Sequence, residues 1–313
     1  MKKILVTGAT GQIGTELVMK LRQIYGNDNV IASNIRDHLD SPIRNTGPFE
    51  LLDVRDQVRF FEVATKYHVD TIIHLAAFLS ATAEKKPLMA WDLNMGGLLN
   101  GLEVARELKC QFFTPSSIGA FGPSTIKDNT PQEVIQRPNT MYGINKVAGE
   151  LLCDYYHEKY GVDTRGLRFP GLISYMAMPG GGTTDYAVHI FYEALKNKSF
   201  ECYLEENTYM DMMYMPDAIN SVIKLMEADP DKLVHRNAYN VSAMSFSPKE
   251  IEAEIQKYIP DFLMTYKVDP MRQKIADSWP NSIDSQAAID EWQFRPVYDL
   301  EMMVKDMLNK VKV

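Results

Sequence analysis

Tyr142 and Lys146 are four residues apart in a segment, residues 142–156, whose apolar spacing predicts a helix. Side chains four apart point from the same face of a helix, so we expect the phenol and the ammonium group to be neighbours. A free tyrosine titrates at about 10, which is too high for a base at neutral pH. A nearby cation stabilises the phenolate and lowers that pKa. The pair could therefore take the proton from an alcohol hydroxyl.

Ser117 is expected beside this pair. It ends the run 111–117, which predicts a strand, and its hydroxyl could bind the same alcohol oxygen and align it. The Tyr-x-x-x-Lys spacing occurs by chance in many helices, so its meaning depends on context. A serine at a preceding strand end and a glycine turn near the start of the chain provide that context.

The glycine turn covers residues 7–14, Thr-Gly-Ala-Thr-Gly-Gln-Ile-Gly, between an apolar run at 4–6 and an amphipathic run at 15–24. This order predicts a strand, a turn and a helix. Gly8 permits the tight turn, Gly11 lets a pyrophosphate approach the backbone, and Gly14 lets the helix pack on the strand. The phosphates would lie at the helix N-terminus. The alternative is an ordinary strand-to-helix turn, which the flanking runs make the weaker interpretation.

The ends of the next two predicted strands bear on the choice of cofactor. The strand at 29–33 leads to Asn34, where an acidic residue usually holds the adenosine ribose hydroxyls. Asparagine can still bind a hydroxyl but does not repel a 2′-phosphate, and Arg36 follows closely. We therefore predict NAD, with weakened discrimination against NADP. Asp53, in the strand at 49–54, could accept from the adenine amino group or cap the following helix.

Two further strand ends are predicted at the same edge. The run 70–77 ends in small residues that would let a cofactor ribose lie against the backbone, and we interpret its His74 as a packed strand residue. Ser80, on the following loop, is either a simple loop residue or a substrate contact. Pro170 ends a strand at 165–169, where backbone groups could meet the nicotinamide carboxamide. A long helix at 87–108 is expected to form core or a subunit interface.

Residues 178–187, Met-Pro-Gly-Gly-Gly-Thr-Thr-Asp-Tyr-Ala, form a glycine loop that leads into a predicted helix. Thr183 or Thr184 could cap that helix. Exposed backbone N–H groups and the two hydroxyls would form a site for a small carboxylate. The alternative is a flexible linker into a capped helix. Further along, Trp279 lies in a polar loop and could be a structural plug or a shield over the substrate.

Several of these stretches together resemble the short-chain-type NAD-dependent L-threonine 3-dehydrogenases, within the extended short-chain dehydrogenase/reductase superfamily. They are residues 7–14, 115–122, 141–143, 167–171, 179–188, 211–218 and 279–280. The resemblance covers nearly the whole chain. It implies oxidation of the threonine hydroxyl to 2-amino-3-oxobutyrate, which can lose carbon dioxide or feed a ligase that forms glycine. It also implies a homodimer that packs through the helices containing Asn94 and Tyr142.

The residue patterns and the resemblance together give three sets of expected site residues. The catalytic set is Ser117, Tyr142 and Lys146. The expected NAD contacts are Gly8, Gly11, Gln12, Ile13, Gly14, Asn34, Arg36, Asp53, Val54, Leu75, Ala76, Ala77, Asn94, Tyr142, Lys146 and Pro170. The expected contacts of the substrate, L-threonine, are Ser80, Ser117, Tyr142, Gly180, Thr183, Thr184 and Trp279.

Two other functions remain open. Sugar-nucleotide epimerases and dehydratases share the fold and the Tyr/Lys pair, but they usually place an arginine before the aspartate that corresponds to Asp211. This chain has Met210 there, which removes a charge-assisted contact to a diphosphate. A catalytically inactive NAD-sensing regulator of the same fold is the second alternative, and the presence of the Tyr/Lys pair argues against it.

Length and composition set the outer limits. At 313 residues, the chain predicts an α/β fold: a Rossmann-type doubly wound parallel sheet with a smaller C-terminal α/β substrate-binding lobe. We assign residues 1–170 and 212–242 to the first and residues 171–211 and 243–313 to the second. A net charge of -8 argues against nucleic acid or an anionic membrane as partner. Three separated cysteines suit core positions in a reducing cytoplasm and predict no metal site.

Overall fold

The large sheet is parallel throughout, as expected for strands that alternate with helices. The structure is a computed structural model that describes residues 1–176 and 178–312. Its seven strands have the order β10-β6-β5-β4-β1-β2-β3, so the strand order reverses between β1 and β4. The bounds are β1 (Ile4–Thr7), β2 (Val30–Asn34), β3 (Phe49–Leu51), β4 (Thr71–His74), β5 (Gln111–Ser117), β6 (Thr164–Phe169) and β10 (Tyr239–Asn240). The predicted doubly wound sheet is confirmed.

Helices cover both faces of this sheet because its strands are apolar on both sides. One face carries α1 (Gln12–Tyr25) and α8 (Met215–Glu227), and the other carries α2 (Gln57–Lys66), α5 (Gly97–Leu108) and α6 (Met141–Tyr160). Between β4 and α5 lie α3 (Ser80–Lys85), α4 (Pro87–Trp91) and a π-helical turn, η2 (Asp92–Gly96). The long helix predicted at 87–108 is therefore interrupted by η2.

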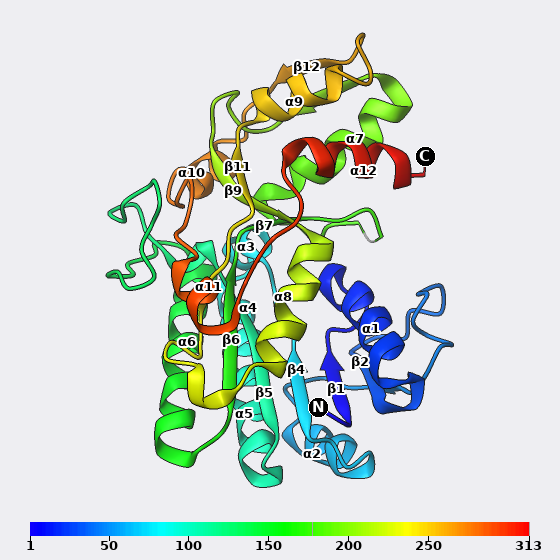
Figure 1. Ribbon diagram of the computed structural model, residues 1–313, viewed down its shortest axis with the longest axis vertical. Coiled ribbons are helices and arrows are strands. Elements are labelled where there is room, and N and C mark those ends of the chain that lie inside the picture. Colours follow the sequence, from blue (N-terminus) through cyan, green and yellow to red (C-terminus); the bar gives the residue numbers. More distant parts are fainter. Residues whose placement is uncertain (177, 313) are drawn as a thin grey trace.

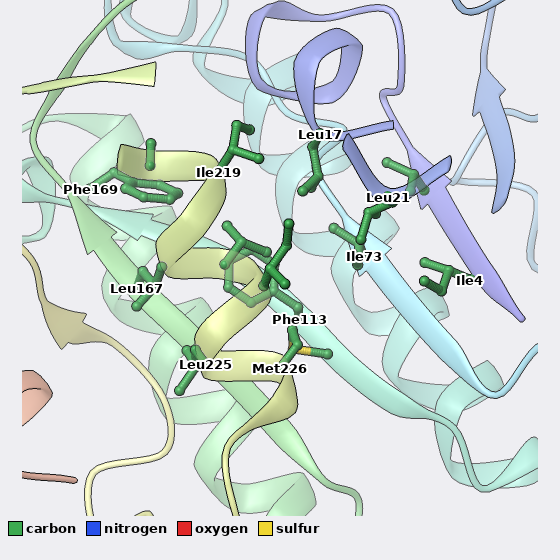
Figure 2. Packing of buried hydrophobic residues seen from close by; sticks show 14 of the residues in the cluster. Ile4, Leu17, Leu21, Ile73, Phe113, Leu167, Phe169, Ile219, Leu225 and Met226 are labelled. Atoms are coloured by element: carbon green, nitrogen blue, oxygen red, sulfur yellow. The ribbon is translucent and has the colours of Figure 1, made fainter. Parts of the chain in front are cut away.

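Successive strand residues supply the two cores. On the α1/α8 face, Ile4 and Phe113 are fully buried against Leu17 and Ile219, and Figure 2 shows α8 lying across the strands in this cluster. On the opposite face, Leu5 and the neighbouring strand residues pack against α2 and α5. The sheet is therefore held rigidly from both sides, which fixes its carboxyl edge.

The smaller lobe lies at one end of the large sheet (Figure 1). Its strands are β7 (Gly171–Ile173), β9 (Met210–Tyr214) and β11 (Met244–Phe246), with β9 in the middle, and the separate pair β8 (Ser199–Cys202) and β12 (Leu263–Tyr266). Its helices are α7 (Tyr186–Asn197), α9 (Pro248–Gln256), α10 (Pro270–Ala276) and α12 (Leu300–Lys310). The remaining helix, α11 (Gln286–Trp292), packs near β10, and Trp292 and Phe294 belong to the core of the large sheet.

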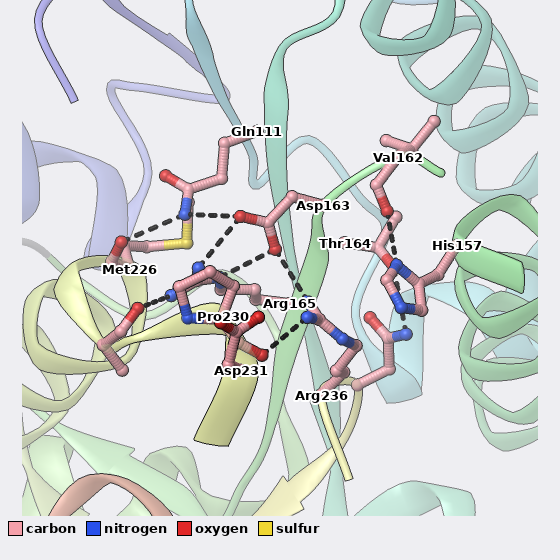
Figure 3. Close-up of polar contacts among 12 residues, drawn as sticks. Gln111, His157, Val162, Asp163, Thr164, Arg165, Met226, Pro230, Asp231 and Arg236 are labelled. Atoms are coloured by element: carbon pink, nitrogen blue, oxygen red, sulfur yellow. Dashed lines mark hydrogen bonds and ion pairs between the residues drawn. The ribbon is translucent and has the colours of Figure 1, made fainter. Parts of the chain in front are cut away.

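The amino ends of β5 and β6 are joined to the end of α8 by a buried polar network (Figure 3). Arg165, only 2% exposed, donates to the carbonyls of Leu225 at 2.6 Å and Ala228 at 2.8 Å, and pairs with Asp163 at 2.9 Å. Arg236 approaches Asp163 at 2.9 Å. Burial acts to raise the pKa of Asp163, but hydrogen bonding and charge from the two arginines hold it below its usual value. The network therefore ends α8 and anchors it to the sheet.

Among the described residues, we find no helix with the length and apolar character needed to cross a membrane. The three cysteines are free and buried, as expected for core positions.

We predict that Arg165→Met lowers the free energy of unfolding by about 3 to 5 kcal/mol, because it leaves two carbonyls without their donor and removes one of the two arginines that pair with Asp163. Urea denaturation measures the loss. The control is Arg106→Met, whose pairs with Glu103 and Glu107 are more exposed, with an expected loss below about 1 kcal/mol. Equal losses in the two variants would contradict the assigned role of Arg165.

Candidate active site

A cleft of about 440 Å³ lies along the carboxyl edge of the large sheet, where it meets the smaller lobe. Parallel strands direct the loops after them to this edge, and ligands bind where the strand order reverses. Sixteen of the predicted site residues line the cleft: Gly8, Gly11, Gln12, Ile13, Gly14, Leu75, Ala77, Ser80, Ser117, Tyr142, Lys146, Pro170, Gly180, Thr183, Thr184 and Trp279. The other six, Asn34, Arg36, Asp53, Val54, Ala76 and Asn94, are not part of this lining.

The glycine turn has the geometry of a dinucleotide cradle. Gly8 has a φ of +65°, and a Cβ there would lie 2.8 Å from the backbone nitrogen of Ala76. A Cβ on Gly14 would lie 2.5 Å from the carbonyl oxygen of Gly8, so the close approach of α1 to β1 requires glycine. No side chain in the described ranges caps α1, and the buried Nε2 of Gln12 has no partner among them. Free donors at a helix N-terminus fit a pyrophosphate.

Residues predicted near the adenosine have other contacts. Asn34 donates to the hydroxyl of Thr10, which joins the end of β2 to the glycine turn. Arg55 pairs with Asp53 at 2.7 Å, and hydrogen bonding from this arginine lowers the pKa of the carboxyl group. The expectation that Asp53 caps the next helix is wrong, because Asp56 caps α2 by accepting from the Arg59 backbone. Direct contacts to the adenosine stay predictions.

Asn94, another predicted NAD contact, supports neighbouring backbone. Asn94, in the π-helical turn, accepts from the backbone nitrogen of Phe78 at 2.8 Å and donates to Asn145 at 3.2 Å. It therefore braces the loop after β4 against α6. Val54 is buried, and Ala76 lies beside the glycine turn. π-Helical turns are frequent at functional sites, which agrees with this position.

The catalytic set comes together at the end of β5. Ser117 accepts from the backbone nitrogen of Gly119 at 3.1 Å, and the ring of Tyr142 lies against Gly119, where a Cβ would be 3.0 Å from the ring. Lys146 donates to the carbonyl of Pro115 at 2.6 Å, and its Nζ is 5.3 Å from the centre of the Tyr142 ring. The helix that carries both residues is capped by Thr140, which accepts from Gly143. One strand end and one helix face thus position all three groups.

The pKa of Tyr142 in the chain by itself lies above its ordinary value. Burial raises it to about 12, and a hydrogen bond with Ser117 acts in the opposite direction. Burial also lowers the pKa of Lys146 to about 8, while the charge of Glu150 acts to raise it. We expect the pKa of the phenol to be lowered by Lys146 together with the positive nicotinamide ring, and in the chain by itself burial outweighs Lys146. Desolvation of two neighbouring groups outweighs their mutual influence.

The glycine loop is arranged differently from the prediction. The backbone nitrogens of Gly181 and Gly182 donate to Asp185 at 3.0 and 2.7 Å, so these two N–H groups are already used. Thr183 and Thr184 lie within a short 3-10 turn, η4 (Thr183–Asp185), and do not cap α7. The prediction that Thr183 or Thr184 caps α7 is therefore wrong. The prediction that these loop amides are free is wrong as well, because Asp185 accepts from both of them. The sequence signal for it was an acidic residue three positions after Gly182, the spacing of a capping box.

What remains at this end of the cleft is a group of hydroxyls and an indole. The hydroxyls of Ser80 and Thr183 are 3.3 Å apart, although 103 positions separate them in the chain. Trp279 is 5% exposed, and its Nε1 is buried without a partner among the described residues. Its carbonyl accepts from Lys127 at 2.8 Å. Trp279 is therefore a buried plug that also lines the cleft, and its role as a shield over the substrate stays a prediction.

His74 is a packed strand residue, as predicted. Its ring lies between Phe60 and Phe112, and Nδ1 contacts the hydroxyl of Thr7 at 3.2 Å. Burial lowers the pKa of His74 to about 3, and the charge of Lys146 adds to this effect. No group of three or more potential metal ligands that could hold an ion occurs in the described part of the chain.

The fold and this cleft are those of a nucleotide-dependent oxidoreductase or epimerase. The sequence profile of the NAD dependent epimerase/dehydratase family matches residues 4–242. The chain belongs to this family, whose cofactor is NAD.

Three individual proteins are close to the chain. An uncharacterized epimerase/dehydratase of Staphylococcus saprophyticus is 62% identical over 312 residues, covering 100% of this chain and 98% of that protein. The X-ray structure of L-threonine dehydrogenase from Clostridium difficile has a TM-score of 0.98 and 66% identity, covering 99% and 98% of the two chains. A monomeric L-threonine 3-dehydrogenase from a metagenome database, in its apo form, has a TM-score of 0.94 and 45% identity, covering 98% and 97%.

The pH dependence of stability tests the buried state of His74. Because its folded pKa is below its unfolded value of about 6.5, the unfolded chain binds the proton first as the pH falls. Stability should therefore decrease between pH 6.5 and 3, by about 2 kcal/mol at pH 5 from this residue. In His74→Asn, urea denaturation at pH 7.5 and 5.0 should show a smaller difference. An unchanged difference would show that His74 is not buried in its neutral form.

Proposed function

We propose that the chain oxidises the 3-hydroxyl of L-threonine to 2-amino-3-oxobutyrate, with NAD as the hydride acceptor. The observation that carries this proposal is that Ser117, Tyr142 and Lys146 line the same cleft as Ser80 and Thr183. The likeness to an L-threonine dehydrogenase at 66% identity supports the choice of substrate. The division of the chain into an NAD-binding part and a substrate-binding lobe is part of the proposal.

Tyr142 acts as the base. Its phenolate takes the hydroxyl proton of threonine, and Ser117 binds the same oxygen and holds it in line with the phenol. Bound NAD would supply the acceptor for the hydride from the threonine Cβ and the positive charge of the nicotinamide ring. Because burial alone keeps the pKa of Tyr142 near 12, the phenolate depends on the charge of Lys146 together with further positive charge at this position. The buried site strengthens every such interaction.

The amino acid itself would be held at the glycine-loop end. Ser80, Thr183 and Thr184 supply hydroxyl donors, and the backbone at Gly180 lies beside them in the cleft lining. Asp185, which holds two loop amides, keeps this group of hydroxyls in place. Trp279 covers the site from the smaller lobe. A small zwitterion fits such a set of neutral donors better than a highly charged phosphate compound does.

The sugar-nucleotide alternative receives no support from the residues around Asp211. Met210 and Asp211 are fully buried, and the carboxyl group accepts from Ser242 at 2.7 Å and from the backbone of Ile283 at 2.8 Å. This position therefore faces the interior of the smaller lobe. An arginine for a diphosphate is absent from position 210, and its apolar replacement packs in the core.

We also propose a homodimer in the cytoplasm. Leu88 on α4 is 83% exposed and Leu151 on α6 is 63% exposed, and the two helices are neighbours on one face of the protein. Exposed apolar residues on adjacent helices are typical of a subunit interface. Three buried free cysteines suit a reducing compartment. A monomer, as described for the metagenome relative, is the competing state.

NADH absorbance after addition of L-threonine tests the reaction, with UDP-sugars and no substrate as comparisons. We expect NADH with threonine. Tyr142→Phe should reduce turnover by at least about 100-fold, because the base is lost, while calorimetry should still detect NAD binding.

Tyr155→Phe is the matched control, because Tyr155 lies on the same helix but is 46% exposed, and it should keep its activity. Absence of NADH with L-threonine, L-serine and related 3-hydroxy amino acids would remove the proposed reaction. Loss of NAD binding in Tyr142→Phe would mean that the role of the phenol is misassigned.

Light scattering tests the dimer. Leu151→Glu should halve the mass in solution, since two buried carboxylates would face one another across the interface. Leu263→Glu, at an equally exposed leucine of β12 in the smaller lobe, should leave the mass unchanged. A wild-type chain that is already monomeric would refute the interface.

A further inference from the structure

A third ionisable residue continues the catalytic face of α6. Glu150 follows Lys146 by four positions, just as Lys146 follows Tyr142, so the three side chains share one side of the helix. The Glu150 side chain is only 7% exposed. A buried carboxylate is costly unless it is fully paired, and the proposed reaction gives this group no direct part. Its contacts therefore indicate what it does.

Four donors surround the Glu150 carboxylate. Arg168, on β6, approaches it through Nε at 3.1 Å and Nη2 at 2.9 Å, which is the bidentate geometry of a strong pair. Gln136 donates at 2.9 Å, and the hydroxyl of Ser116 donates to the other side. Arg168 in turn donates to the carbonyl of Gln132 at 2.8 Å. The carboxylate is thus held by β5, β6 and the segment that precedes α6.

These contacts also fix the part of β5 that Lys146 contacts. Ser116, which Glu150 binds, lies between Pro115 and Ser117 in β5. The carbonyl of Pro115 accepts from Lys146 at 2.6 Å, and Ser117 is the residue expected to align the substrate. Glu150 therefore fixes the strand segment that carries both the acceptor of Lys146 and the alignment hydroxyl. It does so from the helix that carries Lys146 itself.

The charges around Lys146 give Glu150 a second effect. The ionisable groups that face Lys146 are Tyr142, Glu150 and Cys153 on α6, His74 on β4, and Arg168 beyond Glu150 on β6. Burial keeps the phenol and the thiol protonated and the imidazole neutral near pH 7. The charge of Glu150 opposes the effect of burial on the ammonium group.

We propose that Glu150, paired with Arg168, is a positioning residue that keeps Lys146 in its cationic form and fixes residues 115–117 against α6. Through Lys146 it supports the phenolate of Tyr142. This inference rests on the proposed function, because it assigns a role within the same reaction.

The test is the pH profile of L-threonine oxidation in Glu150→Gln. The amide keeps much of the shape and removes the charge, so Lys146 should lose its proton at lower pH. The alkaline limb of kcat/KM should therefore move down by about one pH unit. A variant that is less active at every pH but keeps the wild-type profile would reduce Glu150 to a purely structural role and overturn the proposal.

Two further variants keep the test decisive. Asp163→Asn removes a carboxylate that is likewise paired with an arginine of β6, at the opposite end of the strand, and should lower stability without moving the profile. If Glu150→Gln does not fold, Glu150→Met combined with Arg168→Met removes both charges without leaving either unpaired. Its profile should still be shifted, and a wild-type profile in this double variant would overturn the proposal.

A failure of the proposed function gives a different result. If the wild-type chain forms no NADH from L-threonine, the reaction is wrong, and the pH dependence of NAD affinity becomes the readout. Calorimetry should then show that NAD binding by Glu150→Gln weakens at a lower pH than binding by the wild type, since Lys146 is one of the expected NAD contacts. Identical pH dependence in the two proteins would overturn the role of Glu150 independently.

Discussion

Desolvation of the Tyr142–Lys146 pair is the constraint on which the site depends. Burial raises the pKa of the phenol to about 12 and lowers that of the ammonium group to about 8, so each group resists the charge that the proposed reaction requires. The same exclusion of water strengthens the electrostatic interaction of the pair with any charge beside it. The phenol of such a site is a weak base until further positive charge lies beside it. The proposed chemistry is therefore restricted to the complex with cofactor and substrate.

Fixed contacts around Tyr142 and Lys146 hold these desolvated groups in place. Lys146 is held by the carbonyl of Pro115, and the strand that carries this carbonyl is tied to Glu150. The sheet beneath is packed from both faces, so the strand end does not yield easily. Rigid support of this type preserves an arrangement of buried polar groups that would otherwise relax toward water. The packing that stabilises the fold therefore also maintains the geometry of the site.

In the proposed function, the smaller lobe and the start of α3 select among ligands. Two amides of the lobe's glycine loop donate to Asp185, and the proposed function therefore assigns the ligand contacts at this end to the hydroxyls of Ser80 and Thr183. Neutral donors and a buried indole from Trp279 create a compact end to the cleft. Family members with the same sheet and the same Tyr/Lys pair can therefore act on different substrates, because function is set by the loops that the common fold presents.

Local patterns in the sequence determined the glycine turn, the strands that surround it and the helix that carries Tyr142 and Lys146, because each depends on spacing within a few residues. Local patterns also suggested Ser80, Thr183 and Trp279 as substrate contacts, and the family resemblance agreed with them. The contact of Asp185 with the loop amides is local and has the spacing of a capping box. Tertiary structure alone decided that Asn94 braces the loop after β4. It also decided the direction of the Tyr142 pKa, since burial is a sum over the whole fold. Contacts between residues far apart in the chain leave no periodic signal, so the sequence by itself could not predict them.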